Sequence, residues 1–187
     1  MAIFFISDLH IGHANVIRFD NRPFCSLKDF NTKIIENWNN AVSPDDEVYI
    51  LGDFGWKNTM ALDVIKQLKG KKHLILGNHD HLINSELKQY FESIQDYKVI
   101  VTDNQCIVLS HYPIAFWYGQ HKYTILLYGH LHNTVEEDIF RDFVNELTEK
   151  GIPAECYNVG CMMPYMNYTP HTLEEIRNGF TQLKNIN

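Results

Sequence analysis

The chain has 187 residues, of which 45% are hydrophobic and 21% charged, and its formal net charge is −7. This balance is typical of a folded globular protein and argues against disorder. The negative charge argues against a diffuse grip on long nucleic acid, which requires a basic face that displaces counterions. No apolar run reaches the length of a membrane span, and the first residues lack the features of a signal peptide. We therefore expect one domain over residues 1–187, in the cytoplasm, with all four cysteines as free thiols.

The first half of the chain alternates predicted strands with predicted helices. Ser26 is a capping residue, and Phe30 and Trp38 follow it at helical spacing. A second helix is expected from Thr59 to Gly70, because a glycine in the left-handed conformation ends many helices. Such alternation is typical of parallel strands joined by helical crossovers. The strands predicted here are Ile3–Ile6, Glu47–Leu51 and His73–Leu76.

The second half begins with one predicted strand after another. Residues 97 to 128 contain no helical pattern, which indicates antiparallel pairing. Helices are expected over residues 85–92, from Thr134 to Gly151 and after Thr172. The whole pattern predicts an α/β fold with a mixed sheet or with two sheets packed together. The remaining predicted strands are Val99–Thr102, Cys106–Leu109, Thr124–Tyr128 and Cys156–Val159.

Polar side chains follow five of the predicted strands at the point where each strand ends. Three of these strand ends also carry a glycine, which allows backbone and ligand to come close. Because the carboxyl ends of parallel strands form the natural crevice of an open α/β sheet, we expect these side chains to converge. They are Asp8, His10, Asp53, Asn78, His79, Asp80, His111, His130 and His132.

The ligand types in this set indicate a catalytic metal site. They offer carboxylate or amide oxygen and imidazole nitrogen without thiolate, which suits manganese, iron, zinc or cobalt. Seven of these side chains are too many for one tetrahedral ion that keeps an open position, but they fit two ions that share a carboxylate. The seven are Asp8, His10, Asp53, Asn78, His111, His130 and His132. Two divalent ions would leave the site positive and able to attract a phosphate, despite the negative charge of the chain.

The five blocks D-x-H, G-D, G-N-H-D, H and G-H-x-H occur in this order from residue 8 to residue 132. In residues and order they resemble the calcineurin-like metallophosphoesterase superfamily. The resemblance implies a four-layer α/β/β/α sandwich with mixed β-sheets and two divalent ions at the ends of its central strands. It also divides the ligands between the ions: Asp8, His10 and His132 for the first, Asn78, His111 and His130 for the second, and Asp53 between them.

The resemblance implies a metal-dependent hydrolase that cleaves a phosphomonoester or phosphodiester with a hydroxide held between two ions. Manganese is the ion expected to support activity in vitro. His79 would protonate the leaving oxygen, and Asp80 would orient that imidazole. The short motif spacings leave little room for a cap domain, so we expect an open site for a small phosphorylated substrate such as a nucleotide. The alternative is a non-catalytic scaffold of the same fold that binds other proteins; the presence of His79 and of all seven ligand positions favours the enzyme.

Several residues near the motifs have two interpretations. His13 could face the metals or the phosphate, and Arg18 or Arg22 could fork onto the phosphate or carry a solvated surface charge. Trp56 and the aromatic residues after the His111 block could wall the pocket, although we expect them to fill the core. His81, the last residue of the G-N-H-D-H run, is expected to lie on the surface.

Overall fold

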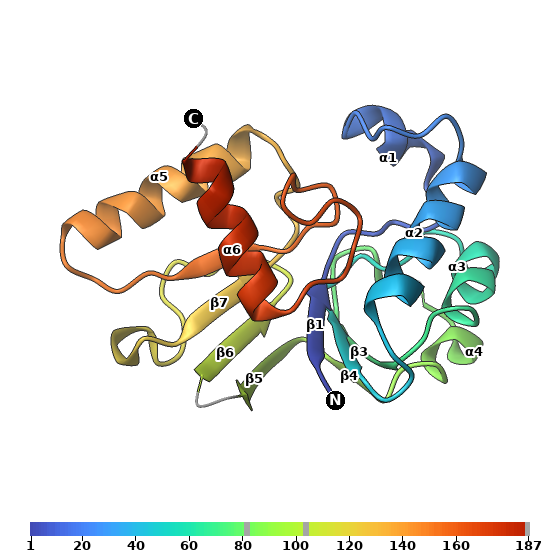
Figure 1. Cartoon of the computed structure of the whole chain (residues 1–187), viewed down its shortest axis with the longest axis horizontal. Coiled ribbons are helices and arrows are strands. Elements are labelled where there is room, and N and C mark those ends of the chain that lie inside the picture. Colours follow the sequence, from blue (N-terminus) through green and yellow to red (C-terminus); the bar gives the residue numbers. More distant parts are fainter. Residues whose placement is uncertain (81–82, 103–104, 186–187) are drawn as a thin grey trace.

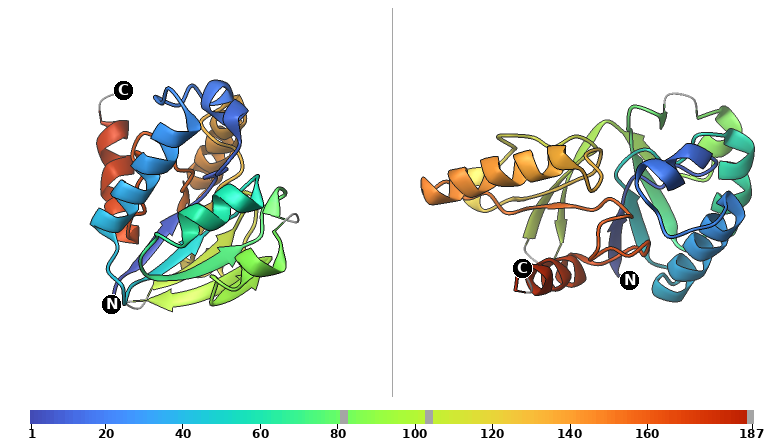
Figure 2. Two further views of the ribbon diagram at one scale, coloured as in Figure 1. Left: turned by 90° about the vertical axis from the view of Figure 1, so that its right-hand side faces the viewer. Right: turned by 90° about the horizontal axis from the view of Figure 1, so that it is seen from above.

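Two four-stranded sheets pack face to face in the computed structural model, which describes residues 1–80, 83–102 and 105–185. Helices cover the outer faces of the sheets, so the chain forms the four α/β/β/α layers that the sequence predicts (Figure 1). The view from above shows the same order of layers, with the helices of the N-terminal half on one side and the long helix of the C-terminal half on the other (Figure 2).

The first sheet comes from the N-terminal half and is parallel throughout, as predicted. Ile6, Ile50 and Leu74 are fully buried because the sheet is covered on both faces, and this is why its strands read as apolar runs. The edge strand was not predicted, since Ser93-Ile94-Gln95 contains no apolar run. The strands, in their order in the sheet, are β1 (Ile3–Ile6), β2 (Glu47–Ile50), β3 (Lys71–Ile75) and β4 (Ser93–Gln95).

The second sheet consists of β5 (Tyr97–Thr102), β6 (Gln105–Ser110), β7 (Ile125–Tyr128) and β8 (Cys156–Asn158), in that order. β5 and β6 are antiparallel, as predicted. The expectation of antiparallel pairing was wrong for β6 and β7, which are parallel. Residues 111–124 return along the sheet before β7 begins, through the short 3-10 helix η2 (Gln120–Lys122). As a result, β6 and β7 end at the same edge.

Three helices begin where the capping residues predict, whereas the helix expected from Thr59 begins at Asn58 without a side-chain cap. The side chains of Ser26, Thr134 and Thr172 accept hydrogen bonds from amides in the first turns that follow them. Two helices end earlier than expected. One ends at Ile65, ahead of Gly70, which has φ of +80°, and the helix expected over residues 85–92 ends at Lys88. The short α1 was not predicted. The helices are α1 (Ala14–Phe19), α2 (Leu27–Ala41), α3 (Asn58–Ile65), α4 (Ser85–Lys88), α5 (Val135–Glu149) and α6 (Leu173–Lys184).

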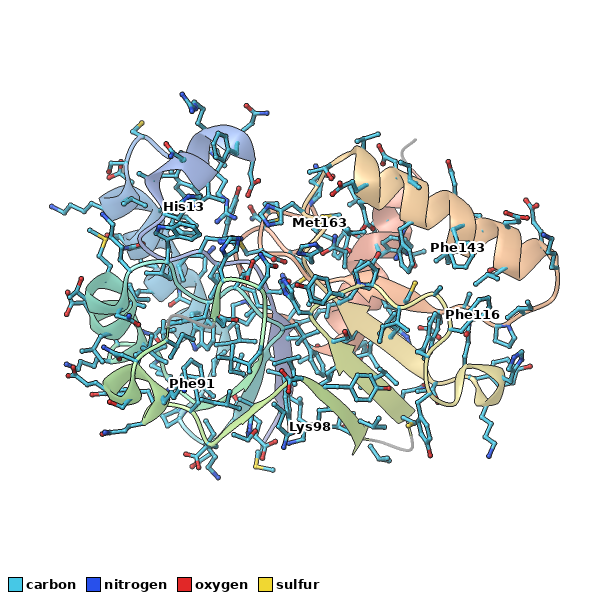
Figure 3. The ribbon with its side chains drawn as sticks, turned by 180° about the vertical axis from the view of Figure 1, so that it is seen from behind. His13, Phe91, Lys98, Phe116, Phe143 and Met163 are labelled. Carbon is cyan, nitrogen blue, oxygen red and sulfur yellow. The ribbon has the colours of Figure 1, made fainter. Side chains whose placement is uncertain are left out.

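Each sheet has its own apolar cover. The helix α2 buries Phe30, Ile34 and Trp38 beside the first sheet, and the indole of Trp38 donates to the carbonyl of Lys69 at 2.9 Å. On the second sheet, α5 covers a separate cluster, and Phe143 of this helix lies near Phe116 of the 111–124 segment (Figure 3). Burial of one such side chain contributes about 2 kcal/mol.

All four cysteines are free thiols, as expected: Cys25 is exposed, Cys106 is half-buried, and Cys156 and Cys161 are buried. Within the described ranges, none of the helices combines the length and apolar character needed to cross a bilayer.

The two sheets are joined at the edge where their parallel strands end. The amide of Ser7, after β1, donates to the carbonyl of Val159, after β8, at 2.8 Å, and the amide of Cys161 donates back to Ser7 at 2.9 Å. In the same region the amide of Asp8 donates to the carbonyl of Gly52 at 3.0 Å. These bonds bring the loops that follow strands of both sheets into one place.

Candidate metal centre

The side chains predicted as metal ligands meet at this shared edge. Asp53 lies in the middle, with its Oδ2 atom 3.5 Å from Nε2 of His10 and 3.7 Å from Nε2 of His111. Within the described residues, three overlapping groups could each hold an ion, and the ligand atoms of each group lie within 4.8 Å of one another. Overlap of this kind is what two neighbouring ions that share a carboxylate require. The groups are Asp8, His10 and His132; His10, Asp53 and His79; and Asp8, Asp53 and His111.

The ligands assigned to the first ion surround a gap between two imidazoles. The Nε2 atoms of His10 and His132 are 3.2 Å apart, and Oδ1 of Asp8 lies 3.6 Å from Nε2 of His132. The other ring nitrogen of His132 donates to Oδ1 of Asp20 at 2.8 Å, which turns Nε2 towards the gap. Two imidazole nitrogens at this separation can share a proton or can both bind a cation. The donor set therefore fits a metal ion.

Two of the ligands assigned to the second ion, His111 and Asn78, also face each other. Nδ1 of His111 lies 2.8 Å from the carbonyl oxygen of Leu51, so this nitrogen carries the proton and Nε2 carries the lone pair. That lone pair faces Oδ1 of Asn78 at 3.1 Å. The His130 ring lies 5.1 Å from the ring of His111. Two acceptors that face each other at the end of a buried strand are the arrangement expected where a cation binds between them.

Five of the seven predicted ligands have left-handed backbone conformations, which cost about 1–2 kcal/mol each for residues with a side chain. Each lies in a segment that follows a strand, within four residues of the strand's end. Because such strain clusters at functional sites, it supports a function for this edge. The residues and their φ values are Asp8 (57°), His10 (51°), Asp53 (54°), His130 (69°) and His132 (52°).

The glycines of the motifs allow the loops to approach each other. Gly52 has φ of +91°, and a Cβ atom at this position would lie 2.2 Å from Nδ1 of His111. A Cβ atom on Gly129 would lie 2.5 Å from Oδ2 of Asp8. Either contact would separate the ligands of one sheet from those of the other. The glycines are thus required by close approach, as the sequence pattern indicates.

Buried charges in the site shift one another's pKa. Burial lowers the pKa of His10 to about 3 and raises that of Asp53. Burial also opposes charge on His132, but the carboxylates of Asp20 and Asp8 outweigh it and raise the pKa of His132 to about 10. For Asp8, burial would raise the pKa, whereas the hydrogen bond and charge of His132 lower it. In the metal-free protein a cationic His132 therefore balances part of the carboxylate charge.

Asp80 has partners different from the expected one. Its carboxylate accepts hydrogen bonds from the amides of Asp53 at 2.7 Å, Gly77 at 2.8 Å and Phe54 at 3.0 Å. The expected orientation of His79 by this carboxylate is corrected accordingly: Asp80 holds the turn of Asp53 against the loop after β3. His79 is placed instead by its own amide, which donates to Oδ1 of Asp53 at 2.9 Å. Burial raises the pKa of Asp80 to about 6.

Arg22 also differs from its expected role as a phosphate ligand. It is only 4% exposed, and its guanidinium donates to Asp20 and to main-chain carbonyls of the loop after β1. Arg18 is exposed and lies over the ring of Phe19. His81 lies outside the described residues. Asp20, which the sequence interpretation missed, carries no motif, and its contact with His132 spans 112 positions of the chain.

A cavity of about 360 Å³ opens beside the ligands, between α1 and the start of α5. His13, labelled at the upper left of Figure 3, lines this cavity, as one of its two interpretations predicts. Its ring lies 4.4 Å from that of Trp56, which is 36% exposed and does not fill the core as expected. Tyr112, Phe116 and Tyr118 are also exposed, whereas Trp117 is buried.

Comparison with known proteins assigns this site to a family. The model of the calcineurin-like phosphoesterase superfamily domain matches residues 1–170. The chain belongs to this superfamily. The matched range contains every predicted ligand, and the family generally depends on divalent metal ions. Family membership and the ligand cluster support phosphoester hydrolysis as the general activity.

Relatives of this phosphoesterase occur in archaea, bacteria and phages. An uncharacterised protein of Methanocaldococcus jannaschii is 30% identical over 183 residues, covering 93% of this chain and 88% of that protein. The Gene 66 protein of Mycobacterium phage D29 is 31% identical over 161 residues, covering 71% and 79%. The crystal structure of a protein of unknown function from Aquifex aeolicus superposes with a TM-score of 0.70 at 31% identity and covers 94% of this chain and 97% of that chain.

Proposed function

We propose that this phosphoesterase hydrolyses phosphoric ester bonds with two divalent metal ions. The observation that carries the proposal is the convergence of seven oxygen and nitrogen ligands from both sheets, with ligand atoms turned towards each other. When bound, the two ions would supply a nucleophilic hydroxide near neutral pH and neutralise charge on the phosphoryl oxygens. Manganese, iron, zinc and cobalt all suit these ligands, and manganese is the ion we propose for activity in vitro. The ligands are Asp8, His10, Asp53, Asn78, His111, His130 and His132.

His79 is the residue we assign to protonation of the leaving oxygen. Its side chain is 33% exposed and lines the cavity, and Nε2 lies 3.9 Å from Oδ2 of Asp53. It thus stands beside the ligand cluster and remains open to a substrate. An imidazole can both hold and release a proton, which suits transfer of a proton to the departing group. Trp56 packs against this ring with the centroids 4.8 Å apart and limits its orientations.

The lining of the cavity favours a small phosphoester as the substrate. Its leaving group would be an uncharged molecule that contains a ring, such as a nucleoside. Phe19, Val16 and Leu131 form an apolar wall beside the metal ligands, and His13 extends it towards Trp56. Glu136 lies at the same cavity and disfavours further negative charge on the leaving group. Aromatic and apolar walls of this kind bind flat rings by stacking and burial.

A substrate screen tests the proposed function. Protein treated with a chelator is supplied with manganese, iron, cobalt or zinc and assayed on phosphomonoesters, phosphodiesters and cyclic nucleotides. We expect hydrolysis that requires an added ion and that disappears in the Asp53→Asn variant, while circular dichroism shows an intact fold. A wild-type protein that binds ions but hydrolyses no ester with any of them would instead support a non-catalytic scaffold.

A further inference from the structure

We propose that Asp20 and Arg22 form a positioning unit that holds His132, and with it the site of the first metal ion, in its binding geometry. This inference rests on the proposed function, because it concerns the affinity for one of the two proposed ions. Neither residue belongs to the ligand set. Their role is to fix the loops and the imidazole that provide it.

Arg22 ties the loop after β1 in place. Nη1 donates to the carbonyl of Leu9 at 3.1 Å, and Nη2 donates to the carbonyl of Asp8 at 2.9 Å. The guanidinium carbon lies 5.1 Å from the centre of the Phe30 ring, so the cation rests on the core beneath the loop. A buried guanidinium is stable only when its donors are paired. Here the pairing fixes the backbone between Asp8 and His10.

The same guanidinium fixes Asp20. Nε and Nη2 of Arg22 donate to Oδ2 of Asp20 at 2.9 and 2.7 Å. The other carboxylate oxygen, Oδ1, accepts from Nδ1 of His132 at 2.8 Å. Each oxygen therefore has its own partner, and Arg22, Asp20 and His132 form a chain of hydrogen bonds from the first sheet to the second. The loop after β1 and the loop after β7 are thereby held at a fixed separation.

This chain sets which nitrogen of His132 is available to a metal ion. With Nδ1–H held by Asp20, Nε2 points at Asp8 and His10, the other two ligands assigned to the first ion. A carboxylate on the far side of a ligand imidazole fixes its tautomer and raises its basicity. Loss of such a partner usually costs 10–100-fold in metal affinity.

The site of the second ion does not depend on the hydrogen-bond chain of Arg22, Asp20 and His132. His111, assigned to that ion, is oriented by the main-chain carbonyl of Leu51, which no side-chain substitution removes. One imidazole of each proposed ion is thus oriented by a different means: His132 by the side chain of Asp20, and His111 by a main-chain carbonyl. Removal of the Asp20 carboxylate should weaken the first ion alone, and this asymmetry separates a positioning role from a general structural one.

The test is a calorimetric titration of metal-free Asp20→Asn protein with Mn²⁺. An Asn side chain has one acceptor oxygen and cannot serve both Arg22 and His132. We expect one binding event to weaken about 10–100-fold and the other to keep its wild-type affinity. The His132→Ala variant shows which event belongs to the first ion. The matched control is Asp142→Asn, which removes an exposed carboxylate in the middle of α5 and should bind both ions like the wild type.

A second measurement does not depend on affinity. In Zn²⁺-loaded, ¹⁵N-labelled wild-type protein, the Nδ1 proton of His132 should exchange slowly with water, because Asp20 holds it. This protection should be lost in Asp20→Asn. If Asp20→Asn does not fold, the Arg22→Lys variant is used instead. A lysine keeps the positive charge but lacks the planar guanidinium that donates two hydrogen bonds to Asp20. We expect the same selective loss of affinity for the first ion.

The outcomes separate this inference from the proposed function. A wild-type protein that binds no ion overturns the proposed function itself. A wild-type protein that binds two ions, together with an Asp20→Asn or Arg22→Lys variant that binds both with unchanged affinity, overturns only the positioning unit. Equal weakening of both ions, with the His132 proton still protected, also overturns it, because this result indicates a purely structural role.

Discussion

The Nε2 atoms of His10 and His132 lie 3.2 Å apart, although 122 positions separate the two residues in the chain. Only a proton or a cation can occupy such a gap between two imidazole nitrogens. Carboxylates flank it on both sides, since Asp8 lies beside His132 and Asp53 beside His10. Positive charge is therefore favoured at this point.

Divalent metal should stabilise the fold. Mn²⁺ at 100 times its dissociation constant should raise the free energy of unfolding by about 2.7 kcal/mol, which is about 5–10 °C in the melting temperature of a chain of this length. Differential scanning calorimetry with and without Mn²⁺ measures the shift. The His132→Ala variant should lose much of it, whereas His121→Ala, at an exposed position in η2, should keep it. An equal shift in both variants would contradict the assigned ligands.

His79→Asn should slow turnover by about 10²–10⁴-fold on esters with poor leaving groups. Aryl esters with acidic leaving groups need little protonation and should lose much less. The plot of log kcat against leaving-group pKa should therefore become steeper in the variant. Metal content, measured by atomic emission, should remain that of the wild type. A uniform loss on all substrates would refute the role as an acid.

Asp80→Asn should lower the free energy of unfolding by about 3 kcal/mol, since a buried carboxylate that accepts three amide hydrogen bonds is replaced by a group that cannot accept them all. Urea denaturation measures the change, with Asp63→Asn, an exposed position of α3, as the control. Activity should fall, but the dependence on leaving-group pKa should match the wild type. A steepened dependence would restore the idea that Asp80 orients His79.

Phe19→Ser should raise KM about tenfold for esters whose leaving group is an aromatic ring, because stacking on one side chain is worth about 1–3 kcal/mol. Methyl phosphate, which cannot reach this wall, should be unaffected. Ile139→Ser is the matched control, since both residues are 64% exposed but Ile139 lies on α5 away from the lining of the cavity. Steady-state kinetics on both substrates measure these KM values. Equal KM values for Phe19→Ser and the wild type on the aromatic ester would show that the ring of the substrate binds elsewhere.

The ligand cluster was predictable because each ligand directly follows a strand, so local order in the sequence becomes proximity in space. The paired sheets were predictable from the same apolar segments. The direction of β7 was not, because it depends on the path of residues 111–124, which has no regular pattern. β4 was missed since its pairing with β3, rather than its own composition, makes it a strand.

The roles of Asp20, Arg22 and Asp80 were beyond sequence reasoning for a related reason. Each role depends on a partner that is distant in the chain or on a main-chain group. Neither kind of partner can be recognised from the neighbouring residues in the sequence. Arg22 resembles a surface cation in sequence, and only the fold shows that the loop after β1 wraps around it. Trp56 was assigned to the core by its residue type, but a loop position beside His13 leaves it partly open to solvent.

The hydrogen bonds that join the two sheets at Ser7 have a consequence for how the molecule could be divided. Neither half of the chain contains all the proposed ligands of either ion. Residues 1–95 contain Asp8, His10, Asp53 and Asn78, and residues 105–170 contain His111, His130 and His132. A chain cut between β4 and β5 would yield two catalytically silent fragments, and their reassembly would be driven by the same cations that the joined protein is proposed to use.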